Sequence, residues 1–295
     1  MGDPVWGDVP TREETYGDWV RSHQYGYVVL TNSFQSLFHS SLAACLEQYH
    51  TTSSTSTAPY QPAFFLDCLA LFRSCRSTES LLYRGYPLDA YALLRDVADR
   101  AIFLGAWAVG LSSYQALNAT SALQEGAGLD RDEIRDRIRR AREQEQGKLL
   151  RLMMGAESGL DPDTIVWLRR WRSLFNLQVH GSRLTTASDF SRWVRRREPL
   201  SLGPVPDVDD VTVYTNTSPE VYWMILRLLP FMQLSPGVFG PSWAYEWSVL
   251  DESFDFYQSG FEALGKPMGT AIRRFIEAKF KLRPGDAYIE YGPNS

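Results

Sequence analysis

Residues 87–110 read PLDAYALLRDVADRAIFLGAWAVG, and this stretch decides the fold class. Pro87 and Asp89 are typical of the start of a helix, and the residues that follow are rich in alanine and leucine. The segment is apolar on almost every side, and its charges are confined to Arg95, Asp96, Asp99 and Arg100. A helix with this pattern is typical of the centre of a helical bundle.

The flanking sequence carries further helix signals: apolar residues recur at spacings of three and four in residues 27–48, and Thr11 with Glu14 has the spacing of a capping box. Further helices are predicted near residues 11–21, 27–48, 62–83, 130–154, 161–180, 219–233, 242–264 and 268–281. Residues 51–60 are polar and low in complexity, which predicts a flexible loop. Residues 182–218 contain several prolines and the alternating run VTVYTN, which predicts an irregular excursion with a short β-hairpin. The sequence therefore predicts an all-α protein: a single helical domain over residues 1–295, a bundle with a long irregular insertion, and C-terminal helices in residues 219–295 packed on it.

Composition narrows the class of protein. The chain has 295 residues, of which 44% are hydrophobic, and a formal net charge of -5, so overall basicity does not drive nucleic-acid binding. Cys45, Cys68 and Cys75 lack metal-ligand spacing and are expected to be reduced thiols in the core. The first residues show no secretory signal, and no apolar run approaches the roughly 20 residues that span a bilayer. We therefore expect a cytoplasmic protein that does not bind membranes.

Metal and cofactor sites are not expected from the sequence. His23, His39 and His50 lack companions at metal-binding intervals, and no cluster of carboxylates resembles a metal site. The sequence also contains no phosphate loop and no nucleophile signature. Any chemistry must therefore come from groups such as arginine and histidine.

One candidate group of this kind is the pair Arg95 and Asp99. They are four residues apart, so both project from the same face of the predicted helix. The pair fits an ordinary ion pair within or between helices. It also fits an arginine that a carboxylate orients for binding an anion such as phosphate.

The second candidate lies in residues 167–181, WLRRWRSLFNLQVHG, which end a predicted helix at His180 and Gly181. Asn176 is one helical turn before His180, and Arg172 is two turns before it. At the end of a helix the outward-pointing carbonyls favour a protonated imidazole. His180 can therefore simply cap its helix, or it can act as a general acid or base.

A basic and aromatic stretch surrounds this helix end. Residues 161–200 contain eight arginines against four acidic residues, a local charge of +4 in an acidic protein. Arginines beside stackable rings suit single-stranded nucleic acid, since the arginines contact phosphates and the rings contact bases. The same residues also fit an alternative in which the tryptophans are buried in the core and the arginines form a solvated rim around them. The candidate RNA-binding residues are Arg169, Arg170, Trp171, Arg183, Arg192 and Arg195.

Two segments together resemble a known family. YPLDAYALLRDVADRAIFLGAW, followed some 80 residues later by FNLQVHGS, resembles the paired signature of helical bacterial proteins allied to the HEPN superfamily (higher eukaryotes and prokaryotes nucleotide-binding). The resemblance covers roughly residues 60–185, and Arg95, Asp99 and His180 stand at the matching positions. It implies a helical bundle that is often a homodimer, with RNA as a partner. It also implies that an active member is a metal-independent ribonuclease of a toxin or antiviral defence system.

The resemblance further implies a mechanism. The ribose 2′-hydroxyl would attack its own phosphodiester while His180 moves the proton and Arg95 or Arg172 neutralises the charge on phosphorus. In the family, four to six residues separate an arginine from the histidine, whereas seven separate Arg172 from His180, and Asn176 stands nearer the expected place. Two hypotheses follow: an RNA-binding or RNA-cleaving protein, and an inactive helical interaction or dimerisation protein with a structural Arg/Asp/His network.

Overall fold

The computed structural model describes residues 9–52, 61–108, 206–233 and 237–263 of the chain. It also describes isolated positions, namely Asp130, Asp132, Glu133, Asp136, Pro162, Val166, Val194 and Pro204. The elements in this part of the chain are helices, without a strand, so the all-α prediction is confirmed there. Within these described ranges, no helix has the length and apolar character needed to span a membrane.

Four helices come from the N-terminal part of the chain: α1 (Val9–His23), α2 (Tyr25–Thr52), α3 (Gln61–Tyr83) and α4 (Pro87–Ala108). All four were predicted from the sequence, although α2 runs on to Thr52. The first two residues of the predicted loop 51–60 are therefore helical, and residues 53–60 lie outside the described part. The buried Cys45, Cys68 and Cys75 form no disulfide, as expected of core thiols.

A glycine turn joins α3 to α4. Gly85 has a φ of +90°, a conformation that residues with a Cβ rarely adopt. Its N–H donates to the Leu82 carbonyl (3.0 Å), and the Tyr86 N–H donates to the Leu81 carbonyl (2.9 Å). These two bonds satisfy the last carbonyls of α3 in the Schellman arrangement, so the chain reverses and α4 returns along α3.

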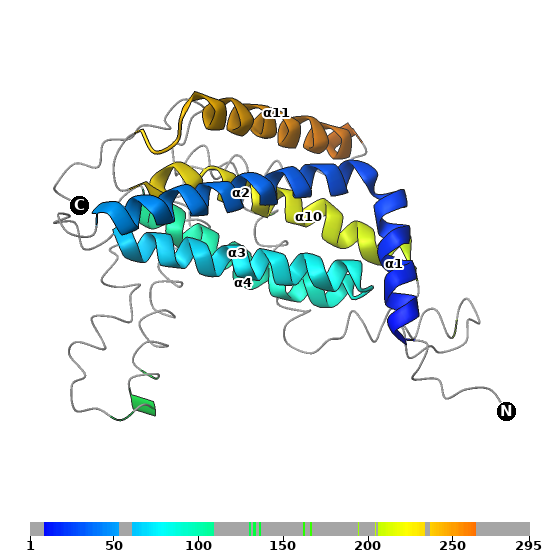
Figure 1. The fold of residues 1–295 in the computed structure, drawn as a ribbon. Coiled ribbons are helices and arrows are strands. Elements are labelled where there is room, and N and C mark those ends of the chain that lie inside the picture. The colour runs from blue at the N-terminus through cyan, green and yellow to red at the C-terminus, as the bar shows by residue number, and fades with distance from the viewer. Residues whose placement is uncertain are drawn as a thin grey trace.

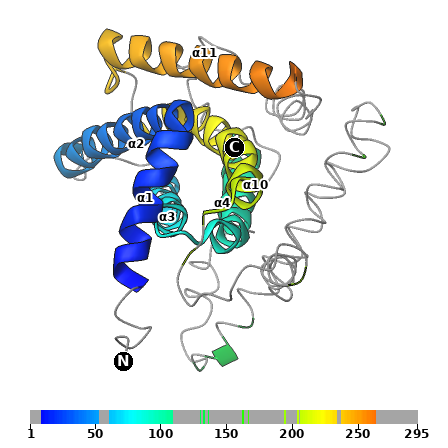
Figure 2. The same ribbon diagram turned by 90° about the vertical axis from the view of Figure 1, so that its right-hand side faces the viewer.

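The C-terminal helices complete the bundle. They are α10 (Val208–Leu226), the 3₁₀ helix η4 (Leu229–Met232) and α11 (Pro241–Ala263). In Figure 1, α2, α3, α4 and α10 run roughly side by side, α11 lies along the top, and α1 stands across the end of the bundle. The turned view in Figure 2 shows α11 as an outer layer beyond α2, with α10 next to α4.

The most enclosed described helix is α10, rather than the α4 segment that the sequence placed at the centre. α10 contacts α4, α2 and α11, and all of its residues from Thr217 to Leu226 are buried. α4 contacts α3 and α10 among the described helices and leaves Leu93 46% exposed. The core forms around α10, with Tyr222, Trp223 and Phe34 among its largest buried side chains.

The prediction for residues 182–218 is wrong over its last eleven residues, since 208–218 form the first half of α10 instead of a hairpin. The Asp207 side chain caps this helix by accepting the Asp209 N–H (2.9 Å). The run VTVYTN alternates like a strand, but Val211 and Tyr214 are three residues apart and both buried, so tertiary packing overrides β propensity. The rest of the predicted excursion lies outside the described residues, apart from isolated positions.

Pro219 lies inside α10, where the sequence placed a helix start. A proline lacks an N–H, so the carbonyl four residues earlier, that of Thr215, loses its helical partner. The Tyr257 hydroxyl of α11 donates to this carbonyl, at 3.4 Å. A neighbouring helix thus compensates in part for the bond that proline removes.

A buried ion pair fastens α11 to the end of α10. Arg227 Nη2 lies 2.8 Å from Asp251 Oδ1, and the Trp223 indole N–H donates to the same oxygen at 2.7 Å. The Arg227 guanidinium also lies over the rings of Trp223 and Trp247, at 4.8 and 5.2 Å from their centroids. Because Asp251 accepts hydrogen bonds from both Arg227 and Trp223, its carboxylate can be buried between the two helices.

Candidate functional site

Arg95 and Asp99 form an ion pair on α4, as their spacing predicts. Arg95 Nε lies 3.6 Å from Asp99 Oδ2, and the two side chains are 22% and 20% exposed. At this distance the carboxylate attracts the guanidinium but does not make a short hydrogen bond to Nε. The pair therefore orients an arginine that is half-buried and still carries further N–H donors.

A second ion pair lies beside it on the same helix. Arg100 Nε donates to Asp96 Oδ2 at 2.8 Å, and these side chains are 38% and 58% exposed. Exposed pairs of this kind contribute roughly 0.2–1 kcal/mol to stability. The Asp96–Arg100 pair thus provides an internal comparison for the more buried Arg95–Asp99 pair.

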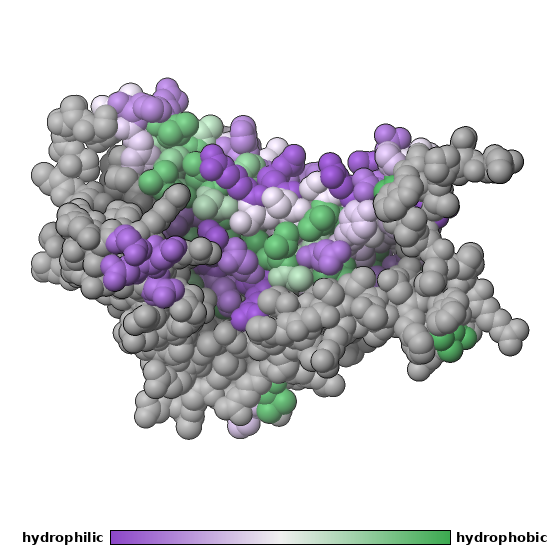
Figure 3. Space-filling view, turned by 90° about the horizontal axis from the view of Figure 1, so that it is seen from below, coloured by the Kyte–Doolittle hydropathy of each residue, from purple (hydrophilic) through white to green (hydrophobic). Residues whose placement is uncertain are grey.

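The face formed by α3 and α4 is mixed in polarity. Figure 3 views the molecule from below and shows hydrophilic residues next to hydrophobic ones on the coloured part of this face. Leu66 of α3 and Leu93 of α4, for example, are 59% and 46% exposed. Polar and apolar residues are thus interspersed on the coloured part of the side that this view shows.

The other predicted site residues lie outside the described part of the chain. They are His180, Asn176 and Arg172 of the catalytic hypothesis, and Arg169, Arg170, Trp171, Arg183, Arg192 and Arg195 of the RNA-binding hypothesis. The convergence of Arg95 with His180 accordingly stays a prediction.

A polar cluster in the core, centred on Glu79 of α3, was not predicted from the sequence. Its atom Oε1 accepts hydrogen bonds from the hydroxyls of Tyr27 (2.6 Å), Tyr222 (2.6 Å) and Tyr214 (3.0 Å). Ser218 lies 2.9 Å from the Tyr27 hydroxyl and extends the network. One carboxyl oxygen thus joins α2, α3 and α10 at the middle of the bundle.

The protonation of this cluster follows from its burial. Burial raises the pKa of Glu79, and the three donated hydrogen bonds and the Arg76 charge oppose that rise without cancelling it. Burial and the nearby Glu79 also raise the pKa values of Tyr27, Tyr214 and Tyr222 well above the ordinary value, so the three tyrosines remain hydroxyl donors. The second carboxyl oxygen of Glu79, Oε2, is buried and accepts no hydrogen bond from the described residues.

A polar cavity of about 680 Å³ adjoins Glu79 between α1, α2 and α3. Charged groups line it, but two of its arginines already have partners. Arg76 Nη1 donates to Gln35 Oε1 (2.7 Å), and Arg21 Nη1 donates to Asp18 Oδ1 (2.7 Å). A buried carboxyl with a raised pKa beside a polar cavity occurs both at functional sites and in structural networks.

A weak sequence signal for this cluster existed. Glu79 lies four residues after Cys75 and three before Leu82, so it occupies the apolar stripe of α3. A carboxylate in such a stripe requires hydrogen-bonding partners. Those partners are 52, 135 and 143 residues away in the chain, and local spacing does not identify them.

Comparisons of the chain with protein-family models, with curated proteins and with solved structures find no match. The described residues contain no group of three or more histidine, cysteine or acidic side chains that could hold a metal ion. The candidate site therefore rests on the Arg95–Asp99 pair and on the sequence that surrounds His180.

Proposed function

We propose that the protein binds RNA and that, where His180 joins Arg95, it cleaves RNA without a metal ion. The observation that carries the proposal is the Arg95–Asp99 pair, in which a carboxylate holds a half-buried guanidinium on α4. The guanidinium is planar and permanently charged, and its N–H groups match the geometry of a phosphate. The second ground for the proposal is the HEPN-like resemblance of the sequence around Arg95 and His180.

The proposed reaction is an internal transesterification. A base removes the proton of the ribose 2′-hydroxyl, the O2′–phosphorus bond forms, and the phosphorus–O5′ bond breaks while O5′ receives a proton. His180 is the proposed group that moves the proton, which typically contributes about 10²–10⁴-fold to rate. Arg95, or Arg172, neutralises the negative charge that develops on the phosphate.

The proposed RNA-binding residues come from the basic stretch of residues 161–200. Arg169, Arg170, Arg183, Arg192 and Arg195 would contact phosphates, and Trp171 would stack on a base. Contacts to phosphates release counterions, so affinity falls as salt increases. For single strands, the slope of log affinity against log salt concentration is about −0.7 for each phosphate contact. Replacing one such arginine should reduce this slope by about the same amount.

The alternative is an inactive helical interaction or dimerisation protein. What favours it is that Asp99 supplies Arg95 with an ion-pair partner on its own helix, so the arginine has a structural role without a ligand. Under this alternative, substitution of Arg95 changes stability or self-association and leaves RNA unaffected.

The deciding experiment compares wild type with Arg95→Ala, His180→Ala and Arg100→Ala. Arg100→Ala is the matched control, because it removes the neighbouring and more exposed ion pair, which lies one residue further along α4. RNA cleavage is measured in EDTA, RNA binding by fluorescence anisotropy over a salt series, and toxicity by growth arrest on expression.

The ribonuclease proposal predicts that Arg95→Ala and His180→Ala lose cleavage and growth arrest while Arg100→Ala keeps both. If wild type binds RNA without cleaving it, and Arg95→Ala weakens that binding, only the binding function remains. If wild type neither binds nor cleaves, the RNA proposal is wrong and the interaction alternative stands.

A further inference from the structure

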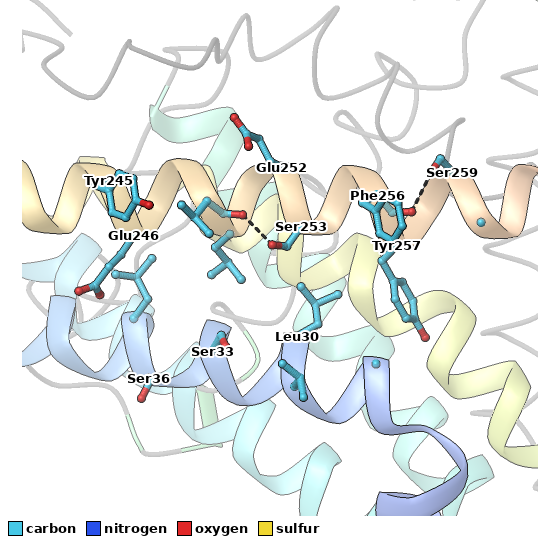
Figure 4. Close-up of a pocket in the computed structure, with 16 residues that line it drawn as sticks. Leu30, Ser33, Ser36, Tyr245, Glu246, Glu252, Ser253, Phe256, Tyr257 and Ser259 are labelled. Atoms are coloured by element: carbon cyan, nitrogen blue, oxygen red, sulfur yellow. Dashed lines mark hydrogen bonds between the residues drawn. The ribbon is translucent and has the colours of Figure 1, made fainter.

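A groove runs along the outer layer of the molecule between α2 and α11, with a volume of about 1190 Å³. We call it the α2–α11 groove. Figure 4 shows Leu30 and Ser33 of α2 on the side of this helix that faces α11, and Ser36 also lines the groove. Because α11 contacts α2 along only part of its surface, apolar side chains of both helices remain open to solvent in the groove.

These open side chains are large. Val29 is 46% exposed, Val249 is 44% exposed and Phe256 is 82% exposed, and all three line the groove. Leaving an aliphatic or aromatic side chain in water costs about 25 cal/mol for each Å² of apolar surface. Contiguous apolar surface on two facing helices is typical of a binding groove for a third helix.

The charges of the groove indicate what kind of helix fits. Its charged lining residues among those described are Glu246 and Glu252, both exposed, and it has no described lysine or arginine. In Figure 4, Glu246 points toward α2, while Glu252 lies on the side of α11 away from α2. An occupant with an apolar face and basic flanks therefore matches both the apolar floor and the acidic rim.

The sequence that follows α11 has these properties. Residues 268–281, MGTAIRRFIEAKFK, are predicted to be helical and lie outside the described part of the chain. Ile272, Phe275 and Ile276 share one face at spacings of three and four. The segment has four basic residues, Arg273, Arg274, Lys279 and Lys281, against the single acidic residue Glu277.

Length and connection also match. The lining residues Tyr245 and Gly260 mark the two ends of the groove on α11 and are about 22 Å apart at a helical rise of 1.5 Å per residue. A helix over residues 268–281 is about 21 Å long by the same measure. α11 ends three residues beyond Gly260, and the connecting residues 264–267 read LGKP, whose glycine and proline suit a chain reversal.

We propose that residues 268–281 bind as a helix in the α2–α11 groove of the same chain, antiparallel to α11. The linker keeps the segment at an effective concentration on the order of millimolar, so even a weak intrinsic affinity keeps the groove occupied. The proposal does not depend on the RNA function, because no residue of the groove belongs to the Arg95–Asp99 pair.

Chymotrypsin treatment of the full chain tests this proposal, because the enzyme cleaves after Phe275 and Phe280 when the segment is released. Cleavage there is followed by mass spectrometry in wild type, Val29→Lys and Val249→Lys. Val213→Lys is the matched control, since Val213 is a 40% exposed valine on α10 outside the groove. The groove variants are expected to be cleaved at least tenfold faster than wild type, and the control at the wild-type rate.

An exchange of charges separates direct contact from damage to the fold. The pair Glu246→Lys and Glu252→Lys should speed cleavage, as should the pair Arg273→Glu and Arg274→Glu. The four changes together should restore protection. The proposal is overturned if wild type is cleaved as fast as Val249→Lys, or if the fourfold variant stays unprotected. It is also overturned if protection falls on dilution, because the occupant would then come from a second copy.

Discussion

Replacing Tyr222 with phenylalanine tests whether the Glu79 cluster stabilises the bundle. The change removes one hydroxyl and keeps the ring, which stacks on Phe34 with 5.0 Å between centroids. The lost hydroxyl contacts Glu79 Oε1 at 2.6 Å and the Tyr214 hydroxyl at 2.9 Å. Tyr222 is 0% exposed, so water does not replace the lost bond.

The expected loss follows from the kind of bond that is removed. A buried hydrogen bond to an ionised group contributes about 1.5–3 kcal/mol, and one to a neutral acceptor about 0.5–1.5 kcal/mol. At a pH where the Glu79 carboxyl is ionised, we expect Tyr222→Phe to lower the free energy of unfolding by about 2 kcal/mol. In a Glu79→Gln background the acceptor is a neutral amide oxygen, and the same change should cost about 1 kcal/mol.

Urea unfolding of the four proteins in this cycle measures both quantities. The control is Tyr245→Phe, which removes a hydroxyl from a tyrosine of α11 that is 72% exposed, and it should leave stability within about 0.5 kcal/mol of wild type. If Tyr222→Phe is as stable as this control, the hydroxyl contributes nothing. If Tyr222→Phe lowers the free energy of unfolding by the same amount in wild type and in Glu79→Gln, the ionised carboxyl is not the partner that matters.

Three other substitutions test separate features. Burial raises the pKa of Glu79 above 4.5, so the protonated carboxyl contributes its full share of the folding stability below that pH, and this share is lost as pH rises through the folded-state pKa. Urea unfolding at several pH values should therefore show wild type losing stability relative to Glu79→Gln as pH increases. Asp251→Ala leaves Arg227 buried without its carboxylate and should lower the free energy of unfolding in urea by about 3–5 kcal/mol. The double change Asp251→Leu with Arg227→Met should lower it by less. Gly85→Ala meets a proline side chain at a positive φ and should cost about 1–3 kcal/mol, while Gly26→Ala, with nothing within 4 Å of the new methyl, should not lower thermal stability.

Local signals in the sequence were sufficient for much of the fold. Apolar patterning and helix-start residues predicted α2, α3, α4 and α11 to within a few residues, because both signals come from residues in adjacent turns. The Arg95–Asp99 pair was predictable for the same reason, since both residues lie on one helix.

Features that depend on distant residues were not predictable. Pro219 and the alternating VTVYTN run pointed away from a helix over residues 208–218, and only packing against α2, α4 and α11 makes that segment helical. The tyrosines that bind Glu79 come from α2 and α10, so their meeting depends on the assembled bundle. The proposed meeting of Arg95 and His180 is a relation of this distant kind, which spacing along the chain does not establish.

The enclosed position of α10 has a consequence for synthesis on the ribosome. α2, α3 and α4 are complete once Ala108 has been added, but the helix that fills the space between them begins 100 residues later, at Val208. At about 5–20 residues per second, this interval lasts on the order of 5–20 s. During it the apolar sides of α2 and α4 that α10 covers in the folded protein do not yet have this helix to pack against.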